Sequence, residues 1–156
     1  MKKYFVSVLT FVIGYCLGYK KEKNVKRMPD ADILAKKHLA IMLLYDQWLK
    51  TKQEGKKIEN YFFVHGYKKI AIYGFSYVGE RLYDELKDTG IEIGYIIDKM
   101  ATNICAEIDV ITPEMEFEKV DAIVVTSNYY YNDIKNTLSL KVDWPIINLE
   151  DILYEI

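Results

Sequence analysis

From Lys69 onward, short uninterrupted apolar runs alternate with stretches of helical spacing, and this alternation restricts the possible fold more than any other feature. Strands that are buried on both faces of a sheet are apolar at successive positions, as in parallel sheets covered by helices. Five runs are expected to form strands: Lys69–Tyr73, Glu92–Ile97, Asp109–Ile111, Ala122–Val125 and Ile146–Leu149. Right-handed crossovers between them predict an α/β fold with a single small parallel sheet in the order 3-2-1-4-5.

Helices are expected before, between and after these strands, at Ala31–Gln53, Ile58–His65, Val78–Asp88, Asn132–Ser139 and Glu150–Ile156. The first of them has one apolar stripe with helical spacing, made of Leu34, Ile41, Met42, Tyr45, Trp48 and Leu49, with His38 on the same face. Asp30 suits the N-cap of this helix, and Gly66 suits the left-handed position that ends the second one. The sheet is therefore expected to follow a set of N-terminal helices.

The N-terminus begins with an uncharged apolar run, Tyr4–Tyr19, which is flanked by basic residues. As a helix this run would be roughly 24 Å long, somewhat shorter than the ~30 Å hydrocarbon core of a bilayer. The stronger basic charge of Lys20–Arg27 follows the run, so a short membrane anchor would leave the rest of the chain in the cytoplasm, at the inner face of the cell membrane. A buried or self-associating helix and a cleaved signal peptide are the alternatives.

Three segments are expected: an apolar helix with a basic tail at 1–28, a helical linker at 29–66, and a nucleotide-binding domain at 67–156. The net charge of −2 provides no basic field for nucleic acid. Cys16 and Cys105 lie far apart, and neither His38 nor His65 has acidic or cysteine neighbours at ligand spacing. We therefore expect no metal site, and we expect both histidines to serve packing or surface roles.

The strongest candidate for a ligand-binding element is the turn that directly follows the first strand and precedes a helix. Its residues are Gly74, Phe75, Ser76, Tyr77, Val78 and Gly79. The dinucleotide-binding fingerprint is G-x-G-x-x-G, and Ser76 takes the place of its middle glycine. Gly74 permits the tight turn, Gly79 permits close packing of helix on strand, and the helix N-terminus offers N–H groups to a phosphate. The alternative is that both glycines serve the turn alone, with no ligand.

Polar residues at the ends of two further strands extend this candidate site. Asp98 ends the second strand, where dinucleotide folds keep an acid for ribose hydroxyls, and Lys99 beside it suits a phosphate. Thr126 and Ser127 follow the fourth strand across the topological switch point, with Tyr129 placed to stack on a base or sugar. Asp98 is equally suited to a turn, and Ser127 or Asn128 to a helix cap.

No arrangement typical of nucleophilic, acid–base or P-loop catalysis occurs in the sequence. The chain also lacks a second domain large enough to hold a substrate against a nicotinamide. We therefore predict that the protein is not a complete enzyme on its own.

The segments Ile70–Gly74 (IAIYG), Gly79–Leu86 (GERLYDEL) and Tyr95–Lys99 (YIIDK), continued by VDAIVVTS and PIINLEDIL, resemble a Rossmann-like module of bacterial capsular and cell-surface polysaccharide biosynthesis proteins. That module is often fused to glycosyltransferases and is similar to the nucleotide-sugar-binding N-terminal domains of sugar acetyltransferases. The resemblance implies an NAD(P)-like or UDP-sugar-like ligand. It also implies a role in surface-glycan assembly beside a glycosyltransferase or another glycan-assembly protein.

Three functions are compatible with these features. The first is an accessory module that binds a nucleotide or nucleotide-sugar for glycan assembly. The second is an NAD(P)-dependent oxidoreductase or epimerase-like subunit that acts on a nucleotide sugar with residues from a partner. The third is a ligand-free scaffold that forms homo-oligomers through its N-terminal helices.

Overall fold

The computed structural model describes residues 31–156. The expected helix at Tyr4–Tyr19, its basic tail and the Asp30 cap lie outside the described residues. The chain divides into two compact units, residues 1–35 and 36–156, and the sheet lies in the second. No helix within residues 31–156 is both long enough and apolar enough to cross a membrane.

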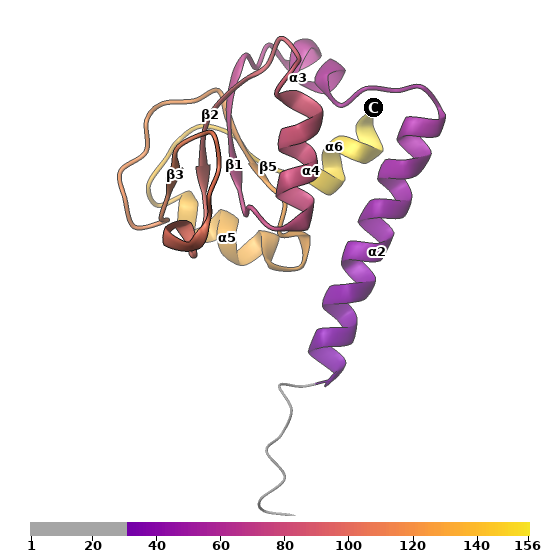
Figure 1. The fold of residues 1–156 in the computed structure, drawn as a ribbon, viewed down its shortest axis with the longest axis horizontal. Coiled ribbons are helices and arrows are strands. Elements are labelled where there is room, and N and C mark those ends of the chain that lie inside the picture. Colours follow the sequence, from indigo (N-terminus) through magenta and orange to yellow (C-terminus); the bar gives the residue numbers. More distant parts are fainter. Residues whose placement is uncertain (1–30) are drawn as a thin grey trace, which may run out of the picture. The chain divides into compact units, whose positions relative to one another are not determined.

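The core of the second unit is a five-stranded parallel sheet in the order β3-β2-β1-β4-β5, as the sequence predicts (Figure 1). Its strands are β1 (Lys69–Tyr73), β2 (Glu92–Ile97), β3 (Val110–Ile111), β4 (Ala122–Val125) and β5 (Ile146–Asn148). Tyr73 at the end of β1 pairs with Ile97 of β2 on one side and with Val125 of β4 on the other. The loops that follow these three strands therefore begin side by side, at the carboxyl edge of the sheet.

The α-helices are α2 (Ala31–Gln53), α3 (Glu59–His65), α4 (Tyr77–Leu86), α5 (Tyr131–Leu138) and α6 (Leu149–Glu155). All five lie within one or two residues of their predicted bounds. Gly66 ends α3 with φ +73°, the left-handed conformation expected there. Two short 3₁₀ helices, η1 (Ala101–Asn103) and η2 (Asn128–Tyr130), follow β2 and β4 and were not predicted. A single 3₁₀ turn is too short to show a hydrophobic period.

Alternate residues of the central strand face two separate cores. Ile70 and Ile72 of β1 pack with side chains from α2, α3, α4 and α6, and we call this side the four-helix face. Ala71 and Tyr73 face the opposite way and pack with α5, with Val120 before β4 and with the partly buried Phe117. We call that side the α5 face. Both faces of the sheet are covered, which accounts for the continuously apolar strands.

The buried stripe of α2 differs from the predicted one. Its buried residues are Leu44, Trp48 and Thr51, whereas Leu34, Ile41, Met42 and Leu49 of the predicted stripe are exposed. Two polar contacts accompany the buried stripe, from Trp48 Nε1 to Glu85 of α4 (2.9 Å) and from Gln47 Nε2 to the Leu153 carbonyl of α6 (2.9 Å). Apolar residues occur around much of this helix, so its neighbours rather than its spacing decide which of them are buried.

Candidate functional site

Gly74 and Gly79 are both required by the geometry of the turn between β1 and α4. Gly74 has φ +93°, and a Cβ there would lie 2.9 Å from the hydroxyl oxygens of Thr126 and Ser127. A Cβ on Gly79 would collide with the carbonyl oxygen of Gly74, so α4 approaches β1 at a distance that only glycine permits. Both positions therefore require glycine, Gly74 for the tight turn and Gly79 for the close packing of α4 on β1.

The residues between the two glycines are divided between core and solvent. The Phe75 ring lies edge-on to Tyr83 of α4 at 5.9 Å and packs on the four-helix face, and Val78 is buried there. Ser76 is the N-cap of α4 but makes no side-chain cap hydrogen bond, and Tyr77 is 80% exposed. Neither aromatic ring covers the carboxyl edge of the sheet. The first turn of α4 thus keeps N–H groups that its own helix does not use.

Asp98 holds the glycine turn in place. Its Oδ2 accepts a hydrogen bond from the Phe75 N–H (2.7 Å), and its Oδ1 accepts one from the Met100 N–H (2.8 Å). This arrangement corresponds to the turn role that the sequence left open. Each carboxylate oxygen has a second lone pair, so Asp98 can still accept a hydrogen bond from a ligand hydroxyl.

Thr126 and Ser127, which follow β4, have different roles. Thr126 is buried, and its hydroxyl hydrogen bonds to the carbonyls of Tyr73 (3.1 Å) and Gly74 (2.8 Å). Neither Ser127 nor Asn128 caps α5, because η2 intervenes and the N-cap of α5 is Tyr130. Asn128 instead accepts a hydrogen bond from Asn148 Nδ2 (2.8 Å). Thr126 therefore fastens β4 to the glycine turn, and Ser127 stays at its surface.

A cavity of about 710 Å³ opens at the carboxyl edge, over β1, β2 and β4 and against α5. Of the predicted site residues, Gly74, Asp98, Lys99 and Ser127 line it. Phe75, Ser76, Tyr77, Val78, Gly79 and Thr126 do not line it. The remaining lining residues are Tyr73, Pro113, Glu114, Tyr130, Asp133, Ile134, Thr137 and Leu138. The cavity is thus displaced from the glycine turn toward the α5 face.

The charged lining of the cavity is mainly acidic, with Asp98, Glu114 and Asp133 against Lys99. A hydrogen bond from the Thr112 hydroxyl is the main cause that lowers the pKa of Glu114, and the charges of Lys141 and Lys99 act in the same direction. Glu114 therefore carries its negative charge at neutral pH. Carboxylates only accept hydrogen bonds, so this lining suits ligand groups that donate them.

Tyr73 is one of the cavity residues that the sequence did not predict. It is the last residue of β1 and only 7% exposed, and it lines the cavity from the α5 face. Burial raises the pKa of its phenol, and the nearby charges of Asp98 and Glu114 raise it further, so the hydroxyl is neutral at pH 7. Strand alternation together with its place beside Gly74 could have identified it.

The tyrosine pair of η2 lies at the edge of this cavity. Tyr130 lines it, and the rings of Tyr129 and Tyr130 meet edge to face at 5.1 Å. Lys37 Nζ of α2 lies over the Tyr130 ring, 4.6 Å from its centroid, and 5.9 Å from that of Tyr129. Of the two η2 tyrosines, Tyr130 rather than the predicted Tyr129 can therefore contact a ligand in the cavity.

A family model described as C2185-like, N-terminal, matches residues 66–144, just over half of the chain. The chain belongs to this family. Neither a curated protein nor a solved structure matches it. The match runs from Gly66, which ends α3, to Trp144 just before β5, so it contains every residue that lines the 710 Å³ cavity. The helix α2 and the strand β5 lie outside the match.

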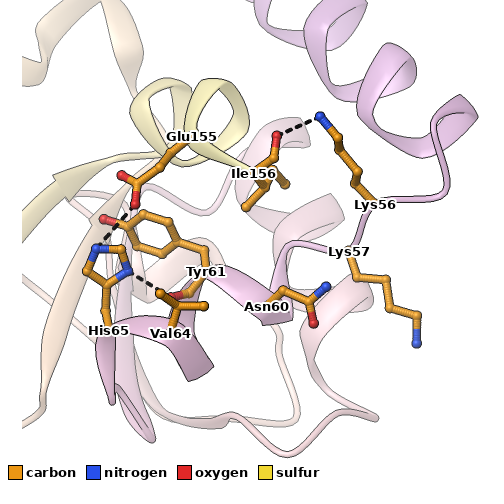
Figure 2. A pocket seen from close by; sticks show the side chains of 8 residues that line it. All are labelled: Lys56, Lys57, Asn60, Tyr61, Val64, His65, Glu155 and Ile156. Carbon is orange, nitrogen blue, oxygen red and sulfur yellow. Dashed lines mark hydrogen bonds and ion pairs between the residues drawn. The ribbon is translucent and has the colours of Figure 1, made fainter.

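A smaller hollow of about 220 Å³ lies between α3 and α6 (Figure 2). His65 is stacked on Tyr61 at 4.2 Å, its Nδ1 lies 2.9 Å from the Tyr61 carbonyl, and its Nε2 lies 3.3 Å from Glu155 Oε1. Lys56 Nζ donates to the Ile156 carbonyl (2.9 Å) and lies 2.9 Å from Glu54. The charged groups around this hollow form hydrogen bonds and ion pairs with one another. These contacts connect α3 and the residues before it to the C-terminal residues, and they leave few charged groups free for a ligand.

Within residues 31–156 of the C2185-like chain, no group of three or more His, Cys, Asp or Glu side chains is arranged to hold a metal ion. Cys105 is an exposed free thiol. The 710 Å³ cavity is consequently the feature of the described chain on which we base a function.

Proposed function

We propose that the protein is an accessory module that binds a nucleotide or a nucleotide-sugar at the carboxyl edge of its sheet. The observation that carries this proposal is the 710 Å³ cavity at the carboxyl edge beside β1 and β4, where the strand order of the sheet reverses. Ligands of open α/β sheets bind outside the carboxyl ends of the strands at this switch point. The cavity volume is also within the range of small-molecule sites, about 300–1,000 Å³.

The surroundings support separate places for the parts of such a ligand. Phosphate groups would lie at the first turn of α4, where Ser76 leaves the helix N–H groups uncapped. Ribose hydroxyls would donate to Asp98, which keeps free lone pairs beside its two backbone hydrogen bonds. A phosphate on the ribose would meet the Asp98 carboxylate, so NAD is expected to bind more tightly than NADP. Lys99 reduces this difference but does not reverse it.

A role in bacterial surface-glycan assembly, with a glycosyltransferase or another glycan-assembly protein as partner, is part of the same proposal. It is supported by the resemblance of the strand, turn and helix segments to modules of polysaccharide biosynthesis proteins. The membrane attachment through Tyr4–Tyr19 also belongs to this proposal.

The test is a thermal-shift and calorimetric panel of NAD(H), NADP(H), UDP-sugars and CDP-sugars on the full chain, with folding checked by circular dichroism. We expect at least one nucleotide to raise the melting temperature. Ser127→Val places two methyl groups at the cavity surface beside Gly74 and should weaken that binding. Ser139→Val, at an exposed position after α5, is the matched control and should not. A folded protein that no ligand stabilises would contradict the proposal.

A further inference from the structure

We infer that the Tyr73 hydroxyl and the carboxylates of Asp98 and Glu114 form a subsite for a neutral, hydroxyl-rich group, such as the sugar ring of a glycoside. The inference deepens the proposed function, because it names the chemical class that the α5 side of the same cavity takes. It assigns phosphate groups to a place outside this subsite.

The first argument is the unused hydroxyl of Tyr73. Three tyrosines pack on the α5 face, and two of them are satisfied by backbone carbonyls. Tyr95 donates to Glu118 O (2.7 Å), and Tyr131 donates to Ile146 O (2.9 Å). Tyr73 is more than nine-tenths buried, yet its hydroxyl has no hydrogen-bond partner among residues 31–156 and the side chain lines the cavity. The hydroxyl is not among the buried unpartnered atoms of the described residues, so it is reached from the cavity, where water or a ligand can supply its partner.

The second argument is the charge around that hydroxyl. The negative charges of Asp98 and Glu114 are close enough to Tyr73 to act on its ionisation, and Asp133 adds a third carboxylate to the lining. Lys99 is the one cation among the lining residues, and Lys141 acts on Glu114 from outside the lining. A phosphate would be repelled here, whereas sugar hydroxyls can donate to the carboxylates and accept from the neutral phenol. The subsite therefore selects hydroxyl groups over anions.

The third argument is the shape of the remaining wall. Ile134 and Leu138 of α5 and the ring of Tyr130 provide apolar surface opposite the polar strand ends. A sugar ring has the same two-sided character, with hydroxyls around its edge and C–H groups on its faces. An apolar wall with a few convergent polar groups is typical of a small-molecule site.

The test follows backbone amide signals by NMR in the full chain, so that it does not depend on which nucleotide the protein binds. The probes are methyl glucoside, methyl galactoside, methyl ribofuranoside and N-acetylglucosamine, with pyrophosphate as the anionic counterpart. We expect at least one sugar to shift the amides of Gly74, Lys99 and Ser127 at millimolar concentration. Pyrophosphate, whose place is the first turn of α4 next to Gly74, should leave the amides of Lys99 and Ser127 unshifted.

Tyr73→Phe should weaken sugar binding about fivefold, the equivalent of one neutral hydrogen bond, while the fold is retained. Tyr83→Phe, on α4 at the other face of the sheet, is the matched control and should bind sugar as the unmodified protein does. The inference is overturned if no sugar shifts the cavity amides, if pyrophosphate shifts those of Lys99 and Ser127 instead, or if Tyr73→Phe equals the control.

These outcomes are separate from the nucleotide panel. Sugar binding without any nucleotide response would refute the proposed function and retain the subsite. A nucleotide response without sugar shifts at the three amides would retain the function and refute the subsite.

Discussion

The two faces of the sheet are built from the same strands but differ in how completely they are closed. On the four-helix face, helices α2, α3, α4 and α6 bury side chains such as Phe62 and Leu82 completely. On the α5 face, one helix and the segment before β4 do the same work and leave the 710 Å³ cavity at its edge. Most of the buried packing of this domain therefore lies on the four-helix face, and the cavity lies on the α5 face.

Unpartnered polar atoms show the same contrast. Among residues 31–156, Trp144 Nε1 is buried without a hydrogen-bond partner, and Tyr73, which lines the cavity, has a hydroxyl without one; both residues belong to the α5 face. On the four-helix face, Trp48 Nε1 donates to Glu85 and Thr51 donates to Gln47 O. A face with unused donors is less stable than it could be, and it can gain those hydrogen bonds when a ligand or partner supplies acceptors.

The largest expected difference between the faces concerns two phenylalanines. Phe62→Ala removes a fully buried ring from the four-helix face and should lower the free energy of unfolding by about 3–5 kcal/mol. Phe117→Ala removes a half-buried ring from the α5 face and should cost about 1 kcal/mol, because less apolar area is lost. Urea unfolding followed by circular dichroism measures both. Equal losses would show that the two faces are equally important for stability.

Asp98→Asn tests the junction between the cavity and the glycine turn. The amide keeps one acceptor oxygen, so one of the hydrogen bonds from Phe75 N and Met100 N is lost along with the charge. We expect the unfolding free energy to fall by about 1.5–3 kcal/mol and one of these two amides, of Phe75 or of Met100, to exchange faster. Asp88→Asn, at an exposed position after α4, is the control. Unchanged exchange at both Phe75 and Met100 would contradict this role of the carboxylate.

Lys141→Met tests how the segment before β4 is held on the α5 face. Lys141 Nζ donates to the carbonyls of Pro113 (2.6 Å) and Met115 (3.3 Å) and lies 5.1 Å from the centroid of Phe117. These contacts are exposed, so the expected cost is only about 0.5–1 kcal/mol. Hydrogen exchange should nevertheless rise along residues 113–117. Lys135→Met on α5 should leave that exchange unaltered, and an identical response from both variants would refute the contact's role.

The smallest expected effect is on tyrosine ionisation. Glu114→Gln removes one of the charges that raise the pKa of Tyr73, so this phenol should titrate at a lower pH in the variant. Tyr61 and Tyr95, whose pKa values burial raises to about 12, should not respond. Phenolate absorbance during an alkaline titration measures the shift, with Glu116→Gln as the control. A shift of the same size in the control would show that Glu114 does not act on Tyr73 directly.

The same raised pKa values predict a common alkaline limit for both faces. Folded Tyr61 and Tyr95 retain their protons up to about pH 12, whereas an unfolded tyrosine loses its proton near pH 10. The unfolded state therefore binds fewer protons in this interval, and stability should decline as the pH rises from about 10 toward 12. Below pH 10 these two tyrosines should contribute no pH dependence.

The strand order of the sheet and most of the helices that connect its strands could be predicted from the sequence. Continuous apolar runs are buried on both sides, and right-handed crossovers leave one strand order, which the structure confirms. The turn glycines were equally predictable, because a left-handed φ at Gly74 and close packing at Gly79 are local backbone requirements. The ligand, the glycan-assembly role and the membrane anchor stay predictions.

Tertiary packing determines which side chains are buried, which are hydrogen-bonded within the protein and which are open to a ligand. Spacing alone could not select the buried stripe of α2, because Leu44 and Leu49 are chemically alike and differ only in their neighbours. Asp98 and Thr126 were predicted as ligand contacts, and the structure uses both to fasten the glycine turn. From the sequence alone, Tyr73 is expected to be an ordinary core residue at the end of a strand. Strand alternation gives the face of the sheet on which Tyr73 lies. That this face is open to a cavity there depends on packing across the sheet, because β1, β2 and β4 end at the same level beside α5.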